Sequence, residues 1–330
     1  MLTSFAYARP TTVPEAVDLL SAEGARAHAG GTDLLGCLRD GVLAAGTVVS
    51  LDGLGELRGI EETRSGGLRI GALTPVAEVA ASERVRLRCA ALAEAAASVG
   101  TPQLRNQGTL GGNLCQKPRC WYYRGGFDCL RKGGDTCSAY EGENRSHAIL
   151  GGGPCFAVHP SDTAPALIAL GAHVTLVGRA ATRTLPLEAF FVLPEADPER
   201  ETVLAPGEIV TGVEMPGPLP GLVSSYRKVR TRAAWDFALV GVAVALRLAS
   251  GVVKDPRIVL SGVAPVPWRS RDAEAALAGA RLDTQSIARA AEAALARAEP
   301  LAGNAYKVPL ARGLLESQLA SLRAAGTGGR

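Results

Sequence analysis

The sequence predicts an α+β fold, because helix signals and strand signals alternate along the chain and neither type dominates. Of the 330 residues, 47% are apolar, which is enough to bury more than one hydrophobic core. A Pro/Gly cluster, "PGPLPG" at 216–221, has the composition of a linker. We therefore expect two domains, residues 1–220 and residues 221–330.

The first half of the chain opens with a helix signal. Thr12 is a candidate N-cap, Pro14 lies in the first turn, and an apolar stripe follows that ends at Gly24. Further elements are predicted in order: short strands at 25–29, 48–54 and 67–73, a helix at 85–100, turns at 101–116, a helix at about 161–170 capped by Ser161, and strands at 173–177, 183–191 and 201–216.

The second half carries the longest apolar segment, "FALVGVAVALRLA" at 237–249. It is shorter than the roughly 18 residues that a membrane helix needs, so it is predicted as a buried strand. A strand at 256–264, two helices within about 271–298 and a final helix from about 310 complete the second half.

Charge and composition exclude several classes of function. The net charge is only +3 and aromatic residues make up 5% of the chain, so we expect no nucleic-acid partner. The first residues lack a basic stretch followed by an apolar one, and no membrane segment is expected. These features predict a cytoplasmic protein, in which clustered cysteines stay reduced and more often bind metal or carry out redox chemistry.

Five of the seven cysteines lie in one segment, residues 115–155, which we call the cysteine loop. Cys120, Cys129, Cys137 and Cys155 have no C-x-x-C spacing, so a zinc ribbon is not indicated. Four thiolates on a flexible loop can still converge on one metal ion or on an iron–sulfur cluster, and spacing does not choose between the two. Cys115 is either an unused thiol or a replacement for Cys120.

Charge near these cysteines favours a cluster over a set of free buried thiols. Between Cys115 and Lys132 there are five basic residues and one acidic residue, Asp128. Nearby cations stabilise a negatively charged thiolate cluster and raise its reduction potential. Free buried thiols remain the simpler interpretation of Cys37 and Cys89, which lie in apolar or helical surroundings.

Two Gly-Gly turns have the chemistry of anion sites. "AGGTDLL" (29–35) follows a short strand, and "TLGGNL" (109–114) follows a polar turn. Paired glycines let backbone N–H groups approach a phosphate closely, and Thr32 and Thr109 add hydroxyl donors. Neither turn matches a Rossmann or Walker motif, so taken singly each one is better interpreted as an ordinary turn.

Several motifs, in this order, resemble those of a known family. "AGGTDLL", "QLRNQGTLGGNL", "HPSD", "SSYRKVRTRAAWDFALVGVAVAL" and "NAYKVPLARGLL" resemble segments of the FAD-binding medium subunit of the molybdenum hydroxylases, the xanthine dehydrogenase and carbon monoxide dehydrogenase group. The cysteine loop is similar to that of members with an extra [4Fe–4S] cluster, such as periplasmic aldehyde oxidoreductase and 4-hydroxybenzoyl-CoA reductase. "RCWYYRGG" and "CSAYEGENRSHAILG" fit the aldehyde oxidoreductase type better.

The resemblance implies a fold and a set of site residues. The fold is a two-part FAD-binding domain of the vanillyl-alcohol-oxidase (PCMH) type with an inserted cysteine loop, followed by a C-terminal α+β domain. Cys120, Cys129, Cys137 and Cys155 would bind the cluster. The residues implied to bind FAD are Ala27, His28, Ala29, Gly30, Gly31, Thr32, Asp33, Leu34, Thr109, Gly111, Gly112, Asn113, Ser161, Asp162 and Lys228.

Two of these residues have simpler interpretations without the resemblance. Lys228 is then one more exposed strand lysine, and Asp162 is a helix cap. The resemblance instead implies that Lys228 lies near the isoalloxazine ring, where a cation stabilises reduced, anionic flavin. Trp235 stands where some NAD-using members have an acidic residue, which argues against NAD as the acceptor.

The function implied is that of an electron-transfer subunit. Its partners would be a large subunit with the molybdenum cofactor, a small subunit with two [2Fe–2S] clusters, and an external acceptor such as a ferredoxin, a quinone or oxygen. A twin-arginine signal on a partner would carry such a complex to the periplasm. Open alternatives are a hydroxybenzoyl-CoA reductase or xanthine dehydrogenase type of enzyme, a stand-alone FAD oxidoreductase, and a non-catalytic scaffold with structural zinc.

Overall fold

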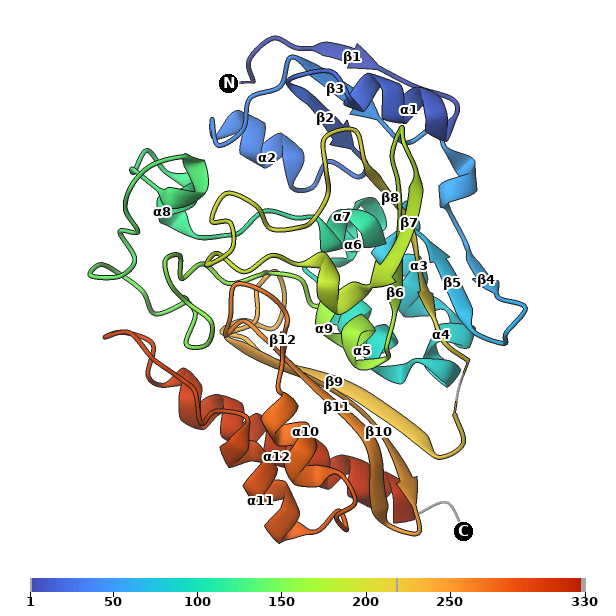
Figure 1. The fold of residues 1–330 in the computed structure, drawn as a ribbon, viewed down its shortest axis with the longest axis vertical. Coiled ribbons are helices and arrows are strands. Elements are labelled where there is room, and N and C mark those ends of the chain that lie inside the picture. Colours follow the sequence, from blue (N-terminus) through green and yellow to red (C-terminus); the bar gives the residue numbers. More distant parts are fainter. Residues whose placement is uncertain (1, 218, 328–330) are drawn as a thin grey trace.

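A small parallel sheet begins the fold of the computed structural model, which describes residues 2–217 and 219–327. Its strands are β1 (Ala6–Ala8), β3 (Thr47–Ser50) and β2 (Ala25–His28), in that order. Helices α1 (Val13–Leu20) and α2 (Leu34–Arg39) accompany it at the top of Figure 1. Thr12 caps α1 as predicted, because its hydroxyl accepts the Glu15 N–H.

The second sheet is antiparallel and lies next along the molecule. Its strand order is β4 (Ile60–Glu62), β5 (Leu68–Gly71), β8 (Ile209–Met215), β6 (His173–Val177) and β7 (Thr182–Pro186). Strand β8 comes from far along the sequence and pairs with both β5 and β6. Two segments separated by the whole cysteine loop are thereby joined in one sheet.

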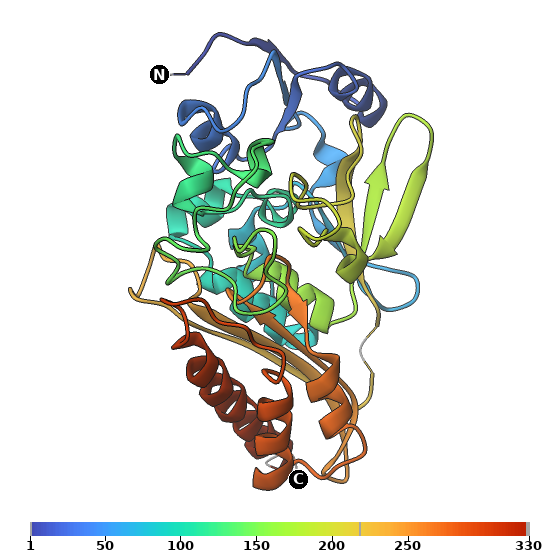
Figure 2. The same cartoon turned by 60° about the vertical axis from the view of Figure 1, so that its left-hand side comes forward.

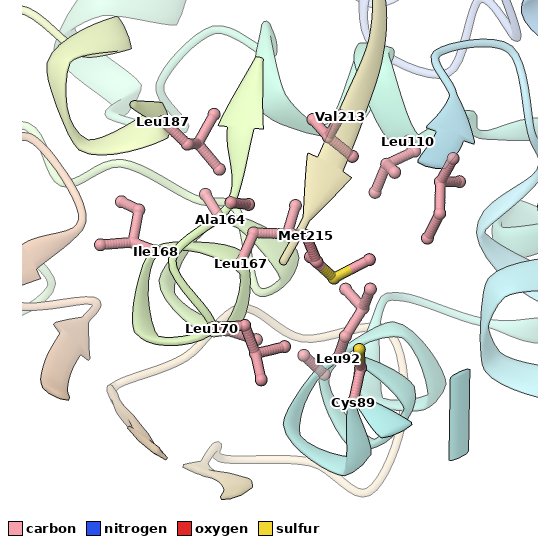
Figure 3. Packing of buried hydrophobic residues seen from close by; sticks show 14 of the residues in the cluster. Cys89, Leu92, Leu110, Ala164, Leu167, Ile168, Leu170, Leu187, Val213 and Met215 are labelled. Atoms are coloured by element: carbon pink, nitrogen blue, oxygen red, sulfur yellow. The ribbon is translucent and has the colours of Figure 1, made fainter. Parts of the chain in front are cut away.

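Helices α3 (Val76–Ala81), α4 (Glu83–Arg88), α5 (Ala90–Ser98) and α9 (Thr163–Ala169) pack beside this sheet. Figure 3 shows their contact, in which Leu92 and Cys89 face Leu167, Leu170 and Met215. All seven residues of α9 are buried, so the helix that follows "HPSD" lies in the centre of the protein.

The C-terminal half forms a third sheet that separates two hydrophobic cores. Strands β9 (Leu222–Val229), β10 (Val240–Ala249), β11 (Val252–Ser261) and β12 (Trp268–Arg269) pair antiparallel. Helices α10 (Arg271–Leu277), α11 (Thr284–Ala293) and α12 (Lys307–Thr327) cover one face, and α5 and α9 contact the other (Figures 1 and 2). Alternate residues of β10 therefore enter different cores, Ala243 on one side and Val242 on the other.

Three sequence-based predictions of local structure were wrong, and the first concerns the strand expected at 183–191, which ends at Pro186 and is followed by a 3₁₀ helix, Leu187–Phe190. The helix expected at 85–100 is broken at Cys89, whose backbone leaves the helical region between α4 and α5. Segment 101–116, expected as turns, forms the short helices α6 (Pro102–Gln107) and α7 (Leu110–Leu114). The side chains of Thr101 and Thr109 cap them by accepting backbone N–H groups.

The cysteine loop contains only α8 (Trp121–Arg124) and two brief 3₁₀ or bridge segments, and it lies at the left of Figure 1. The C-terminal half anchors its last part. Lys307 is fully buried, and its ammonium donates to the carbonyls of Ser146, His147 and Gly262 at 2.6–2.9 Å. Asn304 donates to the carbonyls of His147 and Ala148. The "NAYK" motif thus positions the cysteine loop.

Replacing Lys307 with methionine should lower the free energy of unfolding by roughly 2–4 kcal/mol, because three backbone carbonyls, two of them in buried hydrogen bonds, lose their shared donor. Chemical denaturation followed by circular dichroism measures this change. Lys254→Met, on the exposed side of β11, is the control and should change the free energy by less than about 0.5 kcal/mol. Equal destabilisation by the two variants would contradict the anchoring role.

Candidate cofactor site

The two glycine turns predicted from sequence lie against each other. A Cβ atom on Gly30 would stand 1.8 Å from the backbone oxygen of Gln107, just before the second turn. Gly31 has a φ of +70°, which strains residues with a side chain. A Cβ on Gly111 would stand 2.9 Å from the Ala72 Cβ. Glycine is therefore required here for two backbone segments to approach, and together they form one wall of a groove.

The groove consists of three hollows that share lining residues. The first lies between the two turns, and the apolar residues Leu204, Ile209 and Val210 also line it. The second shares Thr32, Thr109 and Gly112 with it and continues to Asp162. The third shares Asp162, Arg119 and Phe237 with the second and ends at Cys120 and His147.

This groove brings together most of the residues expected to bind FAD. The lining residues are Ala27, Ala29, Gly30, Gly31, Thr32, Asp33, Leu34, Thr109, Gly111, Gly112, Asn113, Ser161 and Asp162. His28 and Lys228 do not line it. The His28 ring packs beneath the turn at Gly31, with a buried Nδ1 that has no hydrogen-bond partner in the described part of the chain.

Lys228 is buried rather than exposed, so its simpler interpretation as a surface lysine is wrong. Its ammonium lies 2.7 Å from the Asp162 carboxylate, and their side chains are 2% and 6% exposed. Tyr226 donates its hydroxyl to the same carboxylate at 2.7 Å. Burial raises the pKa of Asp162, while Lys228 and the hydrogen bond from Tyr226 lower it. Asp162 stands at the N-cap of α9 but makes no side-chain cap bond.

Asn113 and Ser161 connect the second glycine turn to α9. The Asn113 Oδ1 accepts hydrogen bonds from Ser161 Oγ at 2.6 Å and from Thr163 Oγ1 at 2.7 Å. Ser161 Oγ also accepts the Ala164 N–H, so Ser161 bonds the first turn of α9 although Asp162 is the cap residue. These hydrogen bonds hold the second glycine turn and the start of α9 together where both line the groove.

Asp33 has a role that the sequence did not indicate. Its carboxylate accepts Arg119 Nη1 at 2.7 Å, Arg124 Nη2 at 2.8 Å and the Lys117 N–H at 2.7 Å. Cys37 is a free, buried thiol on helix α2, as predicted, and Arg124 Nη1 lies 2.9 Å from its Sγ, so charged groups adjoin it. A residue of the first glycine turn thus binds the cysteine loop.

The four cysteines expected to hold a cluster lie in one neighbourhood. Cys129 and Cys137 form a backbone β-bridge, and a hydrogen bond between Cys137 and Cys155 lowers the pKa of Cys137 and raises that of Cys155. Burial raises the pKa of Cys120, and the charges of Cys129 and Cys137 add to that shift. In the part of the chain that the structure describes, no three His, Cys, Asp or Glu side chains are arranged to hold a metal ion.

Nitrogen atoms of two side chains lie within hydrogen-bond distance of these sulfur atoms. Arg131 Nε donates to Cys155 Sγ at 3.2 Å, and the His147 Nε2 lies 3.3 Å from Cys120 Sγ. Burial disfavours the charge on Arg131, but Cys155 and Glu201 outweigh it and raise the pKa of Arg131. Cys115 lies apart, in the lining of the groove, where burial raises its pKa to about 12. Cys89 is a buried core thiol, as predicted.

Family comparisons agree with this geometry. Residues 3–218 match the family model for the FAD binding domain in molybdopterin dehydrogenase, and residues 224–322 match that for the CO dehydrogenase flavoprotein C-terminal domain. The chain therefore belongs to the flavoprotein subunits of the molybdenum hydroxylases, a family of FAD-dependent oxidoreductases. The α+β fold class and the expected flavoprotein family are confirmed.

Individual relatives are similar over almost their whole length. The aldehyde oxidoreductase FAD-binding subunit PaoB of Escherichia coli is 40% identical over 98% of this chain and 99% of its own. The carbon monoxide dehydrogenase medium chain of Hydrogenophaga pseudoflava is 30% identical over 96% of each chain. A solved carbon monoxide dehydrogenase structure from that organism superposes with a TM-score of 0.78, at 29% identity over 98% of this chain and 99% of the other.

Substituting alanine for Gly30 should weaken FAD binding by at least about tenfold, or ~1.4 kcal/mol. The added Cβ would overlap the Gln107 oxygen and push the two turns apart. The ratio of bound flavin to protein, followed over a series of protein dilutions, measures the loss of FAD affinity. Gly55→Ala is the matched control, since a Cβ there meets no atom within 4 Å. Equal flavin retention in both variants would rule out a role for the close turns.

Proposed function

We propose that this chain is the FAD and [4Fe–4S] electron-transfer subunit of a heteromeric, molybdenum-containing aldehyde oxidoreductase. The observation that carries the proposal is the 40% identity to an aldehyde oxidoreductase FAD-binding subunit over 98% of the chain. The cysteine neighbourhood beside the groove supports the same assignment. In this role the chain passes electrons from its partner subunits to an external acceptor.

The groove residues fit FAD by their chemistry. Backbone N–H groups of the two glycine turns would bind the pyrophosphate, with Thr32 and Thr109 beside them. The apolar residues Leu204 and Ile209 in the first hollow suit one flat ring system, and the hollow at Asp162 suits the ribityl and flavin end. FAD, when bound, can accept electrons singly and in pairs, which suits a subunit between one-electron and two-electron centres.

The four loop cysteines fit a [4Fe–4S] cluster by their donor type and surroundings. Around a single tetrahedral zinc ion, thiolate sulfurs stand about 4 Å apart. In a cubane each sulfur binds a different iron atom, so the ligating sulfurs are spaced more widely. Four thiols in one basic neighbourhood, with the Arg131 N–H at Cys155 Sγ, suit such a negatively charged cluster. When bound, such a cluster transfers one electron at a time.

The two cofactor sites share a wall. Cys120 and Asp162 line the same hollow, and Arg119 lies beside them between Asp33 and the Phe237 ring. We infer that the flavin end of FAD and the cluster are neighbours. Close neighbours exchange electrons without any side chain having to act as an acid or base.

The large subunit would hold the molybdenum cofactor and the small subunit two [2Fe–2S] clusters, and we propose the division of this chain into domains 1–220 and 221–330.

No helix within residues 2–217 and 219–327 is long and apolar enough to cross a membrane. A stand-alone oxidoreductase would turn over an aldehyde as a purified single chain, whereas the proposed subunit would not.

Anaerobic co-purification from the native source tests the assignment as a subunit. The chain should copurify with a molybdenum-containing large subunit and an iron–sulfur small subunit, and the complex should reduce an artificial acceptor with an aldehyde. Xanthine or 4-hydroxybenzoyl-CoA as the better substrate would favour the alternative types of enzyme. A colourless preparation that contains zinc and no flavin or iron would overturn the proposal.

Replacing Cys129 with alanine should remove most of the iron and acid-labile sulfide of this subunit while FAD remains bound. The thiol lies in the cysteine neighbourhood and does not line the groove. Metal analysis and the flavin absorption spectrum measure the two cofactors separately. Cys89→Ala and Cys115→Ala are the controls and should keep the cluster. Unchanged iron in the Cys129 variant would refute the ligand assignment, and iron loss in Cys115→Ala would make Cys115 a ligand.

Lys228→Met should lower the reduction potential of the bound flavin, because a buried cation near the ring stabilises the anionic reduced form. The Asp162 carboxylate would also lose its ion-pair partner, so the pKa of Asp162 should rise further. Spectroelectrochemical titration of the flavin at several pH values measures both changes. Arg227→Met, on the exposed face of the same strand, is the control. The same potential in both variants would place Lys228 away from the flavin.

A further inference from the structure

Arg131 is a buried arginine in contact with one of the proposed cluster ligands. Its side chain is only 1% exposed, and its Nε donates to Cys155 Sγ at 3.2 Å. Arginine is rarely buried to this extent unless its charge is compensated. Of the five basic residues between Cys115 and Lys132, it is the one for which a hydrogen bond to a proposed ligand sulfur is observed in the described part of the chain.

The compensating charge comes from outside the cysteine loop. Glu201, in the segment that precedes β8, accepts Arg131 Nη1 at 3.0 Å, and its side chain is 6% exposed. The other carboxylate oxygen accepts the ammonium of Lys117. Val192 donates its backbone N–H to the Glu201 carbonyl, so the backbone that carries this carboxylate is fixed to the FAD-binding half. Arg131 is therefore fixed between a carboxylate and a sulfur.

This geometry has a direct electrostatic consequence. Reduction adds one negative charge to a thiolate-ligated cluster, and N–H···S hydrogen bonds and nearby positive charge stabilise the reduced form. The effect is large where the charge is buried, because water screens it little. Glu201 opposes the effect, since its negative charge lies against the same guanidinium. The donor raises the cluster potential and its counter-ion limits the rise.

We propose that Arg131 is the positioning residue that sets the reduction potential of the [4Fe–4S] cluster through its bond to Cys155, and that Glu201 attenuates it. This inference rests on the cluster proposed above. It assigns to the pair a control of electron flow between cluster and flavin, since the potential difference decides which of them holds the electron. The contact of the His147 Nε2 with Cys120 Sγ is separate, and substitutions at Arg131 leave it in place.

The test is a redox titration of the anaerobically purified 330-residue chain, monitored by electron paramagnetic resonance of the reduced cluster. Arg131→Met should shift the midpoint potential to a more negative value. Glu201→Gln should shift it to a more positive value, because the amide removes the opposing charge while Arg131 stays in place. Lys132→Met is the matched control. It removes the same charge one residue away, at an exposed side chain that donates to the Gly125 carbonyl, and should shift the potential least.

Each outcome decides the matter. Opposite shifts in the Arg131 and Glu201 variants, with a smaller shift in the Lys132 variant, support the proposal. Equal shifts in the Arg131 and Lys132 variants, or a shift of Glu201→Gln that is absent or negative, overturn it while the cluster itself stands. If the Arg131→Met protein fails to assemble the cluster, the direction of the midpoint-potential shift in Glu201→Gln still tests the proposal. A wild-type chain without iron or acid-labile sulfide would instead refute the cluster, and this inference with it.

Discussion

The ion pairs of Asp33 are the interaction on which the arrangement of the site depends. This carboxylate belongs to the first glycine turn, yet its three donors come from residues 117–124 of the cysteine loop. The Asp33 and Arg124 side chains are 19% and 16% exposed, so their attraction is screened less than that of a surface pair. A loop with little regular structure is thereby fixed to the wall of the cofactor groove, and the two proposed redox sites are kept side by side.

Two further anchors complete the attachment of the loop. Glu201 holds Arg131 and Lys117 from the segment before β8. Lys307 and Asn304 hold the carbonyls of residues 146–148 from the C-terminal half. Each anchor is polar and largely buried, and each joins parts of the chain that are far apart in sequence. Such contacts contribute less to stability than apolar packing of the same volume, but they specify one geometry, which electron transfer between fixed centres requires.

A buried ion pair also lies beside the groove at Asp162. Lys228 is buried with Asp162 as its partner, and Tyr226 supplies the second hydrogen bond to that carboxylate. The strand that carries Lys228 belongs to the C-terminal sheet, whereas Asp162 precedes the central helix α9. The Asp162 end of the groove therefore lies where the two halves of the chain meet, and neither half alone contains both charges.

The sequence by itself determined the local structure and the chemical types of the site. Periodicity and caps correctly predicted α1, β6 and β10, and the motif order identified the family and the glycine turns, because these signals depend on neighbouring residues.

Tertiary structure alone decided which charges pair. Asp33, expected beside a phosphate, binds two arginines, and Lys228, equally consistent with an exposed lysine, is buried. Only the structure shows the helix break at Cys89, whose side chain lies in the same core as residues of α9 and β8. Contacts between residues 84 or more positions apart, such as Asp33 with Lys117, leave no periodic trace in the chain, since only the assembled sheets bring those segments together.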